Sequence, residues 1–315
     1  MQMMMSGGVW DPSLMNATGG TITESGDWRI HSFTTVGIST FTITKLNPAD
    51  PKIEYLIIAG GGAGGSYYYS GGGGAGGYRS SVVGEDSGGG LTNNAETKPT
   101  VTKSDYTITV GAGGAIVSQQ AGNNGGDSSI AGSLNGSSTS FISIGGGGGG
   151  KGVDANDYLG KTGGSAGGNA DWTTPSSRVA GTANQGCSGG GTMGTVGGYG
   201  AGGGGAKGQG DMGGSTATCL GGYCHAGEGI NSSITGTSVG RGGGGGGGNG
   251  SGYAYLYHGT HGGGNGGVAF VANYSSDGAS GTANTGGGGG GGTVGSPTVG
   301  GAGGSGVVII RYKFQ

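Results

Sequence analysis

The chain has 315 residues, of which 94 are glycine, and only 9% of its residues are charged. The net charge of −3 gives no electrostatic reason to bind nucleic acid or an anionic membrane surface. No apolar run approaches the roughly 18 residues of a membrane-spanning helix. No long segment follows a helical period, so the sequence predicts essentially no α-helix.

Unbroken glycine runs reach seven residues, at residues 242–248. Such a run has no side chains for a hydrophobic core and disfavours an α-helix. Two states remain. Disorder is favoured by a glycine and proline content of about a third. The alternative is a set of extended polyproline II helices, with three residues per turn, that hydrogen-bond sideways to one another. The low charge and the strand-like segments between the runs favour this ordered state.

The first 25 residues are expected to form an attachment arm. Residues 1–10 lack the basic stretch and the long apolar run of a signal peptide. Residues 26–144 are then predicted to form a β-rich base that includes the first glycine segments. At its start, Phe41 and Ile43 alternate with threonines, a pattern typical of a strand with one buried face.

The run at residues 53–59 is short and apolar, which is typical of a strand covered on both faces. Residues 106–110 and 141–144 predict two further strands of the base. Residues 306–315 are expected to form a closing C-terminal strand, in which alternate residues are apolar. A strand this apolar needs a partner, and we expect it to pair with residues 53–59.

Residues 145–305 are predicted to form a polyglycine II array with display loops. The expected fold is therefore mostly β and irregular, with essentially no α-helix. A small β-sheet base joins the N- and C-terminal strands, and a bundle of polyglycine II helices projects from it. A scaffold of bare backbone with its bulky residues concentrated in loops is typical of a protein that presents those loops.

Aromatic side chains in these loops are the sharpest functional feature. Tyr253, Tyr255 and Tyr257 alternate, so in an extended loop they project to one side. Tyrosine and tryptophan offer rigid, amphipathic contact area, which suits a protein or sugar surface. The alternative is that these rings cap the ends of the glycine bundle. The receptor-binding candidates are the aromatic and polar residues of these loops: Tyr253, Tyr255, Tyr257, His258, His261, Tyr158, Asp171, Trp172 and Tyr223.

Three consecutive tyrosines, Tyr67 to Tyr69, follow a predicted base strand closely and are expected to serve in packing. Cysteine spacing offers no complete set of metal ligands. Free thiols are the favoured interpretation, and a disulfide between Cys219 and Cys224 stays open. Paired carboxylates across a groove are not evident, so the sequence predicts no catalytic residues and no enzymatic activity. It also predicts no bound metal and no cofactor.

The non-glycine residues between the glycine runs give several short segments a distinctive sequence. They are residues 30–34 (IHSFT), 54–62 (EYLIIAGGG), 71–85 (GGGGAGGYRSSVVGE), 106–115 (YTITVGAGGA), 123–132 (NNGGDSSIAG), 232–239 (SSITGTSV) and 303–312 (GGSGVVIIRY). Together they resemble the glycine-rich domain of tail-fibre and adhesin proteins of tailed bacteriophages, marine and cyanobacterial phages especially.

The resemblance implies a virion protein, assembled in the host cytoplasm and placed on the tail or capsid surface. Its partners would be a host cell-surface receptor, protein or glycan, and other virion proteins bound through the N-terminal region. The sequence leaves open a homotrimer about a fibre axis. The alternative function is a purely structural capsid or tail decoration without receptor contact.

Overall fold

The computed structural model describes most of the chain. The described residues are 14–92, 94–152, 157–170, 175–194, 198–213, 225–250, 257–269, 276–293 and 298–314. Within these ranges the protein contains β-strands and no α-helix, so the predicted fold class is confirmed. The part of the chain that the structure describes also holds no helix of the length and hydrophobicity needed to cross a membrane.

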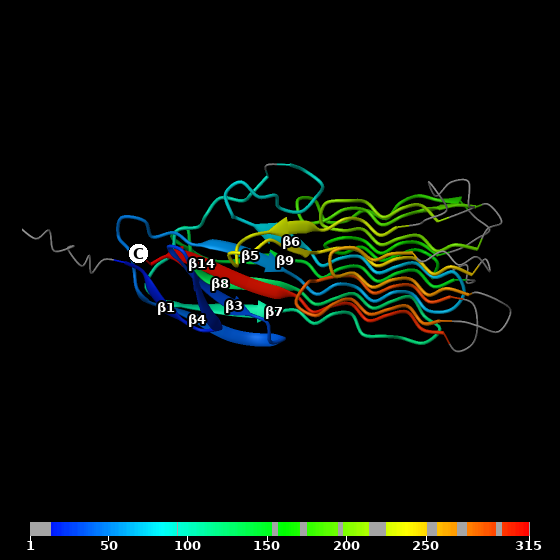
Figure 1. The fold of residues 1–315 in the computed structure, drawn as a ribbon, viewed down its shortest axis with the longest axis horizontal. Coiled ribbons are helices and arrows are strands. Elements are labelled where there is room, and N and C mark those ends of the chain that lie inside the picture. The colour runs from blue at the N-terminus through cyan, green and yellow to red at the C-terminus, as the bar shows by residue number, and fades with distance from the viewer. Residues whose placement is uncertain are drawn as a thin grey trace, which may run out of the picture.

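Two antiparallel sheets of five strands lie together at one end of the molecule (Figure 1). The first has the order β1-β4-β7-β8-β9, and the second has the order β2-β3-β14-β5-β6. Strands of the first sheet are β1 (Asn16–Thr18), β4 (Gly37–Lys45), β7 (Asp105–Val110), β8 (Ser128–Leu134) and β9 (Ser137–Ser143). Strands of the second are β2 (Thr21–Ser25), β3 (Trp28–Phe33), β14 (Val307–Lys313), β5 (Glu54–Ile58) and β6 (Tyr78–Ser80).

Four short strands form two further antiparallel pairs. They are β10 (Pro175–Ser176) with β11 (Thr192–Met193), and β12 (Ile230–Ser232) with β13 (Val239–Arg241). Part of the segment that the sequence assigned to an attachment arm forms β1 and β2, while residues 1–13 lie outside the described residues.

The predicted pairing of the C-terminal strand is confirmed. β14 runs antiparallel to β5, with Val308 opposite Ile57 and Ile310 opposite Tyr55. It also pairs with β3 on its other side, so it occupies the centre of the second sheet. Apolar side chains on both faces explain this position, because a central strand with both faces covered has little polar surface to expose.

Hydrophobic side chains cover both faces of the second sheet. On one face, Phe41 and Tyr106 of the first sheet pack with Ile57 and Tyr312 in a core shared by the two sheets. On the other face, a smaller cluster includes Leu56 of β5 and residues of the β12 region. The base is therefore built from ordinary side-chain packing.

Beyond the sheets, the glycine-rich segments run side by side as a glycine array (Figure 1). Residues 60–66 form a central segment of this array. Their N–H groups take three directions in turn, and every third residue donates to the same neighbour, at 2.9 to 3.0 Å. The three accepting segments are 71–74, 120–126 and 301–304.

Three further segments donate to the carbonyl groups of this central segment. They contribute Gly114, Gly146 and Gly149, and Gly289 and Gly292. Six neighbours therefore surround the segment, and the array satisfies its buried peptide groups by lateral hydrogen bonds. The core of this part is made mostly of backbone, as the sequence predicts, because glycine, which predominates here, lets neighbouring chains approach closely.

The outermost segments repeat the same period in their side chains. Ala112 and Ala115 are exposed, and on the adjoining segment Val299, Ala302 and Ser305 are half-buried. Gly303 donates to Gly114, which places the two segments next to each other. Residues three apart along each of these two segments therefore share an outward face.

A buried histidine in β3, opposite Ile310 of the neighbouring β14, is expected to make the base sensitive to pH. His31 Nδ1 lies 2.7 Å from the Gly19 carbonyl oxygen, which can only accept, so this nitrogen carries the proton. Nε2 then accepts from the Tyr312 hydroxyl, at 3.2 Å. Burial lowers the pKa of His31 from its ordinary value of 6.5, with the Arg29 charge adding to the effect against the Gly19 hydrogen bond.

We therefore expect the protein to lose stability as the pH falls below about 6.5, because the unfolded chain then binds a proton that folded His31 resists. The midpoint of urea unfolding should be lower at about pH 5.5 than at pH 7.5. His31→Gln should reduce this difference, although it lowers stability at both pH values. His258→Gln, at an exposed position, is the matched control and should leave the difference unchanged. An equal difference in the His31 variant would contradict the assignment.

Candidate functional site

A turn of three tyrosines lies at the end of the glycine array away from the sheets. Segment 60–66 leaves β5, and segment 71–76 returns to β6, so the turn between them lies at the far end. We call residues 66–70, Ser-Tyr-Tyr-Tyr-Ser, the tyrosine turn. Both flanking segments are central in the array, which gives the turn a rigid support.

Hydrogen bonds fix both ends of the tyrosine turn. The Ser66 hydroxyl donates to the Val117 carbonyl and accepts from the Gly300 N–H at 3.0 Å. Ser70 donates its N–H to Gly292 at 3.2 Å and accepts from Gly248 at 2.8 Å. Four separate stretches of chain therefore hold the turn in place.

The three rings are half-buried and lie against one another. The Tyr67 and Tyr68 rings meet edge to face with centroids 4.6 Å apart, and Tyr68 and Tyr69 with centroids 6.0 Å apart. Tyr67 and Tyr69 have φ angles of 73° and 49°, in the left-handed region that bulky residues rarely adopt. Such residues cost about 1–3 kcal/mol each and cluster at functional sites.

Sequence reasoning assigned these tyrosines to packing, and in the structure the three rings are half-buried and pack on one another, at the end of the array away from the sheets. The signal was present in the sequence as three aromatic residues between two serines and two glycine runs. Closeness to the base strand along the chain does not place the tyrosines near the base, because the glycine segment between them spans the array from one end to the other.

Of the predicted tyrosine row, only Tyr257 lies within the described residues. Its side chain is 1% exposed, and its ring packs edge to face on Tyr199 with centroids 6.0 Å apart. Tyr257 therefore helps to hold two array segments together.

The remaining described candidates lie apart from one another. His258 is exposed and stacks on His225, with ring centroids 6.0 Å apart. Tyr158 is half-buried, and its carbonyl accepts the Ala170 N–H. The other candidates lie outside the described residues, as do two of the cysteines: Tyr253, Tyr255, Asp171, Trp172, Tyr223, Cys219 and Cys224.

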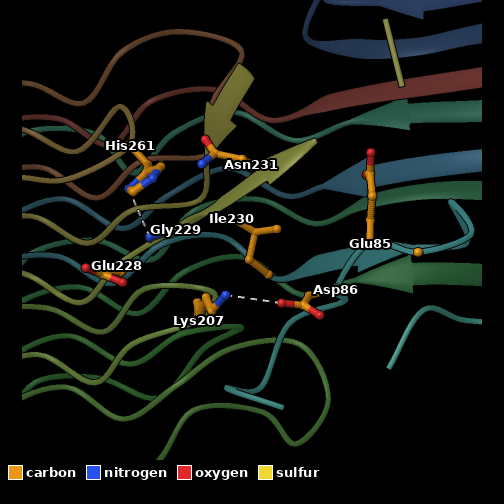
Figure 2. Close-up of a pocket in the computed structure, with 9 residues that line it drawn as sticks. Glu85, Asp86, Lys207, Glu228, Gly229, Ile230, Asn231 and His261 are labelled. Atoms are coloured by element: carbon orange, nitrogen blue, oxygen red, sulfur yellow. Dashed lines mark hydrogen bonds and ion pairs between the residues drawn. The ribbon is translucent and has the colours of Figure 1, made fainter. Parts of the chain in front are cut away.

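His261 lines a pocket of about 260 Å³ where the array meets the sheets (Figure 2). Its Nδ1 accepts the Gly229 N–H at 3.3 Å. Across the pocket, the Lys207 ammonium lies 3.2 Å from the Asp86 carboxylate, and Glu228 adds a further acidic group. The described residues include no group of three or more histidine, cysteine or acidic side chains placed to hold a metal ion.

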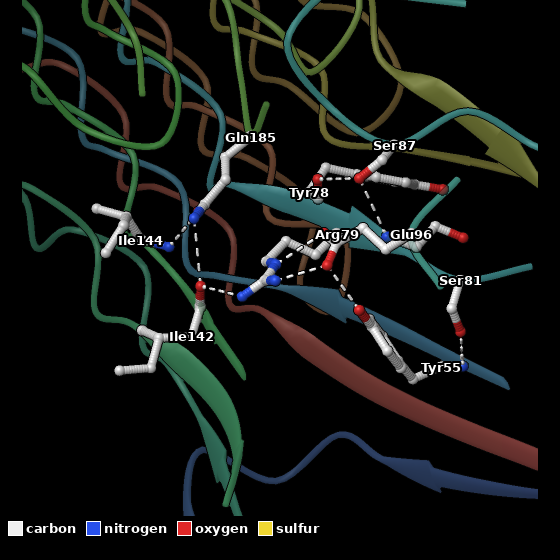
Figure 3. A network of polar contacts seen from close by, with 10 residues as sticks. Tyr55, Tyr78, Arg79, Ser81, Ser87, Glu96, Ile142, Ile144 and Gln185 are labelled. Atoms are coloured by element: carbon white, nitrogen blue, oxygen red, sulfur yellow. Dashed lines mark hydrogen bonds and ion pairs between the residues drawn. The ribbon is translucent and has the colours of Figure 1, made fainter. Parts of the chain in front are cut away.

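A second pocket, of about 420 Å³, is bordered by a network of polar contacts (Figure 3). Arg79 donates from Nε and Nη2 to the two oxygens of Glu96, at 2.7 and 2.5 Å. Tyr55 donates to the same carboxylate at 2.7 Å, and Gln185 accepts from Ile144 and donates to Ile142. These groups satisfy one another, so the network fastens the segment around Glu96 to the second sheet.

Comparison with known families gives one match. A family described as a glycine-rich domain matches residues 34–313. The chain belongs to this glycine-rich domain family. The match spans β4 to β14 and the whole glycine array between them, while β1, β2 and β3 precede it.

In this glycine-rich domain, the two sheets of the base therefore combine strands from inside and outside the matched region. No curated protein matches the chain.

Proposed function

We propose that the protein is a tail-fibre or adhesin component of a bacteriophage virion that binds a receptor on the host surface. The observation that carries the proposal is the tyrosine turn, whose half-buried rings a rigid array holds at the end away from the sheets. The seven segments named in the sequence analysis resemble segments of phage tail-fibre domains, both in their order along the chain and in their non-glycine residues. Recognition would depend on several modest contacts made by preorganised groups, without a chemical step.

We further infer that the array is a bundle of polyglycine II helices. Hydrogen bonds from residues 60–66 return to the same neighbour at every third residue, and the exposed Ala112, Ala115 and Ser118 have the same spacing, with Ile116 exposed in addition. A period of three residues per turn with lateral hydrogen bonds is the arrangement expected of this helix type. It explains how a chain with little hydrophobic core at this end could present residues rigidly.

The proposed orientation in the virion follows from the two unlike ends of the molecule, the sheets and the glycine array. Strand β1, the first strand of the described chain, lies in the sheets, so this end would contact other virion proteins while the opposite end of the array faces the host (Figure 1). Three copies could associate about a fibre axis. In the alternative function, a structural decoration of capsid or tail, the same aromatic loops would lie against neighbouring subunits.

Adsorption to cells tests the function. The purified chain, fluorescently labelled, is mixed with a panel of marine and cyanobacterial strains, and bound protein is counted. We expect binding to some strains only, and competition with adsorption of a phage that carries the protein. A Tyr253→Ser/Tyr255→Ser variant should bind more weakly. Tyr257 is left unchanged because its ring is buried.

A strain-independent signal, or none from the folded chain, would contradict receptor binding. The structural alternative would then be tested by locating the chain in intact virions.

A further inference from the structure

The tyrosine turn combines local strain with rigid support. Tyr67 and Tyr69 both keep left-handed backbone angles, in a turn whose serines are hydrogen-bonded at both ends. Glycine or asparagine would adopt these angles more easily. A strained position held by its surroundings points to a role for the side chain itself.

Neighbouring glycines leave room for the turn. A Cβ at Gly152 would collide with the Tyr68 carbonyl, and a Cβ at Gly198 would come within 3.0 Å of the Tyr69 ring. Gly198 itself has a φ of 70°. The lack of side chains at Gly152 and Gly198 thus leaves room for the Tyr68 backbone and the Tyr69 ring.

We propose that the tyrosine turn is a carbohydrate-contact site, in which the Tyr67 and Tyr69 rings pack against sugar rings of a host surface glycan. This inference rests on the proposed function and names the ligand class and the residues. Tyrosine suits a sugar because its ring face packs against the apolar face of a pyranose and its hydroxyl hydrogen-bonds to the sugar hydroxyls. The ring contacts fix the three tyrosines relative to one another before binding.

Size favours a glycan over a protein as the ligand of this turn. A stable protein interface needs about 20–30 residues on each side. The tyrosine turn has five residues, of which three carry half-buried rings, far fewer than such an interface uses. Nucleic acid is disfavoured by the net charge of −3. A weak contact of this size becomes effective when many copies on a virion bind a repeated surface polymer.

The test uses a strain that adsorbs the labelled wild-type chain. Tyr67→Asn/Tyr69→Asn replaces both rings with a residue that tolerates the left-handed angles. We expect this variant to keep or slightly raise the Tm, because strain is relieved, and to bind about tenfold more weakly, because two ring contacts are lost. Gln119→Asn is the matched control. Gln119 has a φ of 54° in the adjacent turn, and its substitution should leave binding unchanged.

Treatment of the cells identifies the ligand. Periodate, which cleaves sugar diols, should abolish binding of the wild-type chain, and prior protease digestion should leave it intact. Loss after protease alone would show a protein ligand and overturn the carbohydrate assignment. Wild-type binding by the Tyr67/Tyr69 variant would overturn this inference while the proposed function stands. Absence of wild-type binding to every strain would overturn both.

Discussion

Replacing Gly73 by alanine is expected to lower the free energy of unfolding by about 3 kcal/mol or more. Gly73 lies inside the array, where it donates to Gly289 at 2.8 Å and accepts from Gly245 at 2.9 Å. A Cβ at this position would lie under 3.0 Å from the backbone carbonyl of Gly62 and from the next residue. Backbone cannot rotate out of the way as a side chain can, so several segments would have to shift together.

Thermal unfolding measures the effect. At roughly 2–4 °C per kcal/mol for large domains, Gly73→Ala should lower the Tm by about 6–12 °C. Gly126→Ala is the control, because its Cβ would meet its nearest neighbour, the Ala112 backbone nitrogen, at 3.2 Å. This control should stay within about 1 kcal/mol of the wild type, since it also restricts the unfolded chain. Equal stability of the Gly73 and Gly126 variants would contradict a close-packed backbone core.

Removing Arg311 is expected to cost about 3–5 kcal/mol, because it leaves a buried carboxylate with a single cationic partner. Glu54 is 3% exposed, and it accepts from Arg311 Nε at 2.6 Å and from Lys98 at 2.6 Å. The Arg311 guanidinium also lies 4.4 Å from the Trp28 ring centroid. These contacts join β14 to β5 on the face covered by the β12 region.

Urea unfolding of three variants separates the buried charge from ordinary packing. Arg311→Met alone should show the full loss. Arg311→Met/Glu54→Leu should recover much of it, because no buried carboxylate remains. Glu24→Gln, which breaks the pair between Arg29 and the exposed Glu24, should cost less than about 1 kcal/mol. A double variant as unstable as the single one would show that Arg311 acts mainly through packing.

Much of the fold could be predicted because its signals are local. The apolar run at residues 53–59 and the alternating apolar residues of the C-terminal strand suffice to identify β5 and β14 as partners. Glycine runs likewise predicted a core of backbone hydrogen bonds, since no other core is open to a chain without side chains. The extent of the base was harder to predict, because residues 16–25 have little apolar alternation and pair mainly through neighbouring strands.

The burial and position of the candidate tyrosines could not be predicted from the sequence, because they depend on which residues are close together in space. Tyr257 belongs to an alternating row in the sequence, yet it is buried against Tyr199 because two array segments meet there. Tyr67 to Tyr69 follow a base strand in the sequence, yet they lie at the opposite end of the array because the intervening glycines are extended. Whether a residue at the end of the array is buried depends on which segments lie next to it. Glycine runs have no side chains that would specify those neighbouring segments.

Composition and hydrophobic pattern by themselves determined a β fold without α-helix, a sheet that joins both ends of the chain, and an array held by its backbone. Only the tertiary structure decided which segments surround residues 60–66, which tyrosines are buried, and where Glu54 finds its cationic partners. The physical reason is that strand formation follows from the side chains of a few adjacent residues. The order of packing among near-identical glycine segments follows from the whole set of lateral hydrogen bonds, together with the few bulky residues that each position can accommodate.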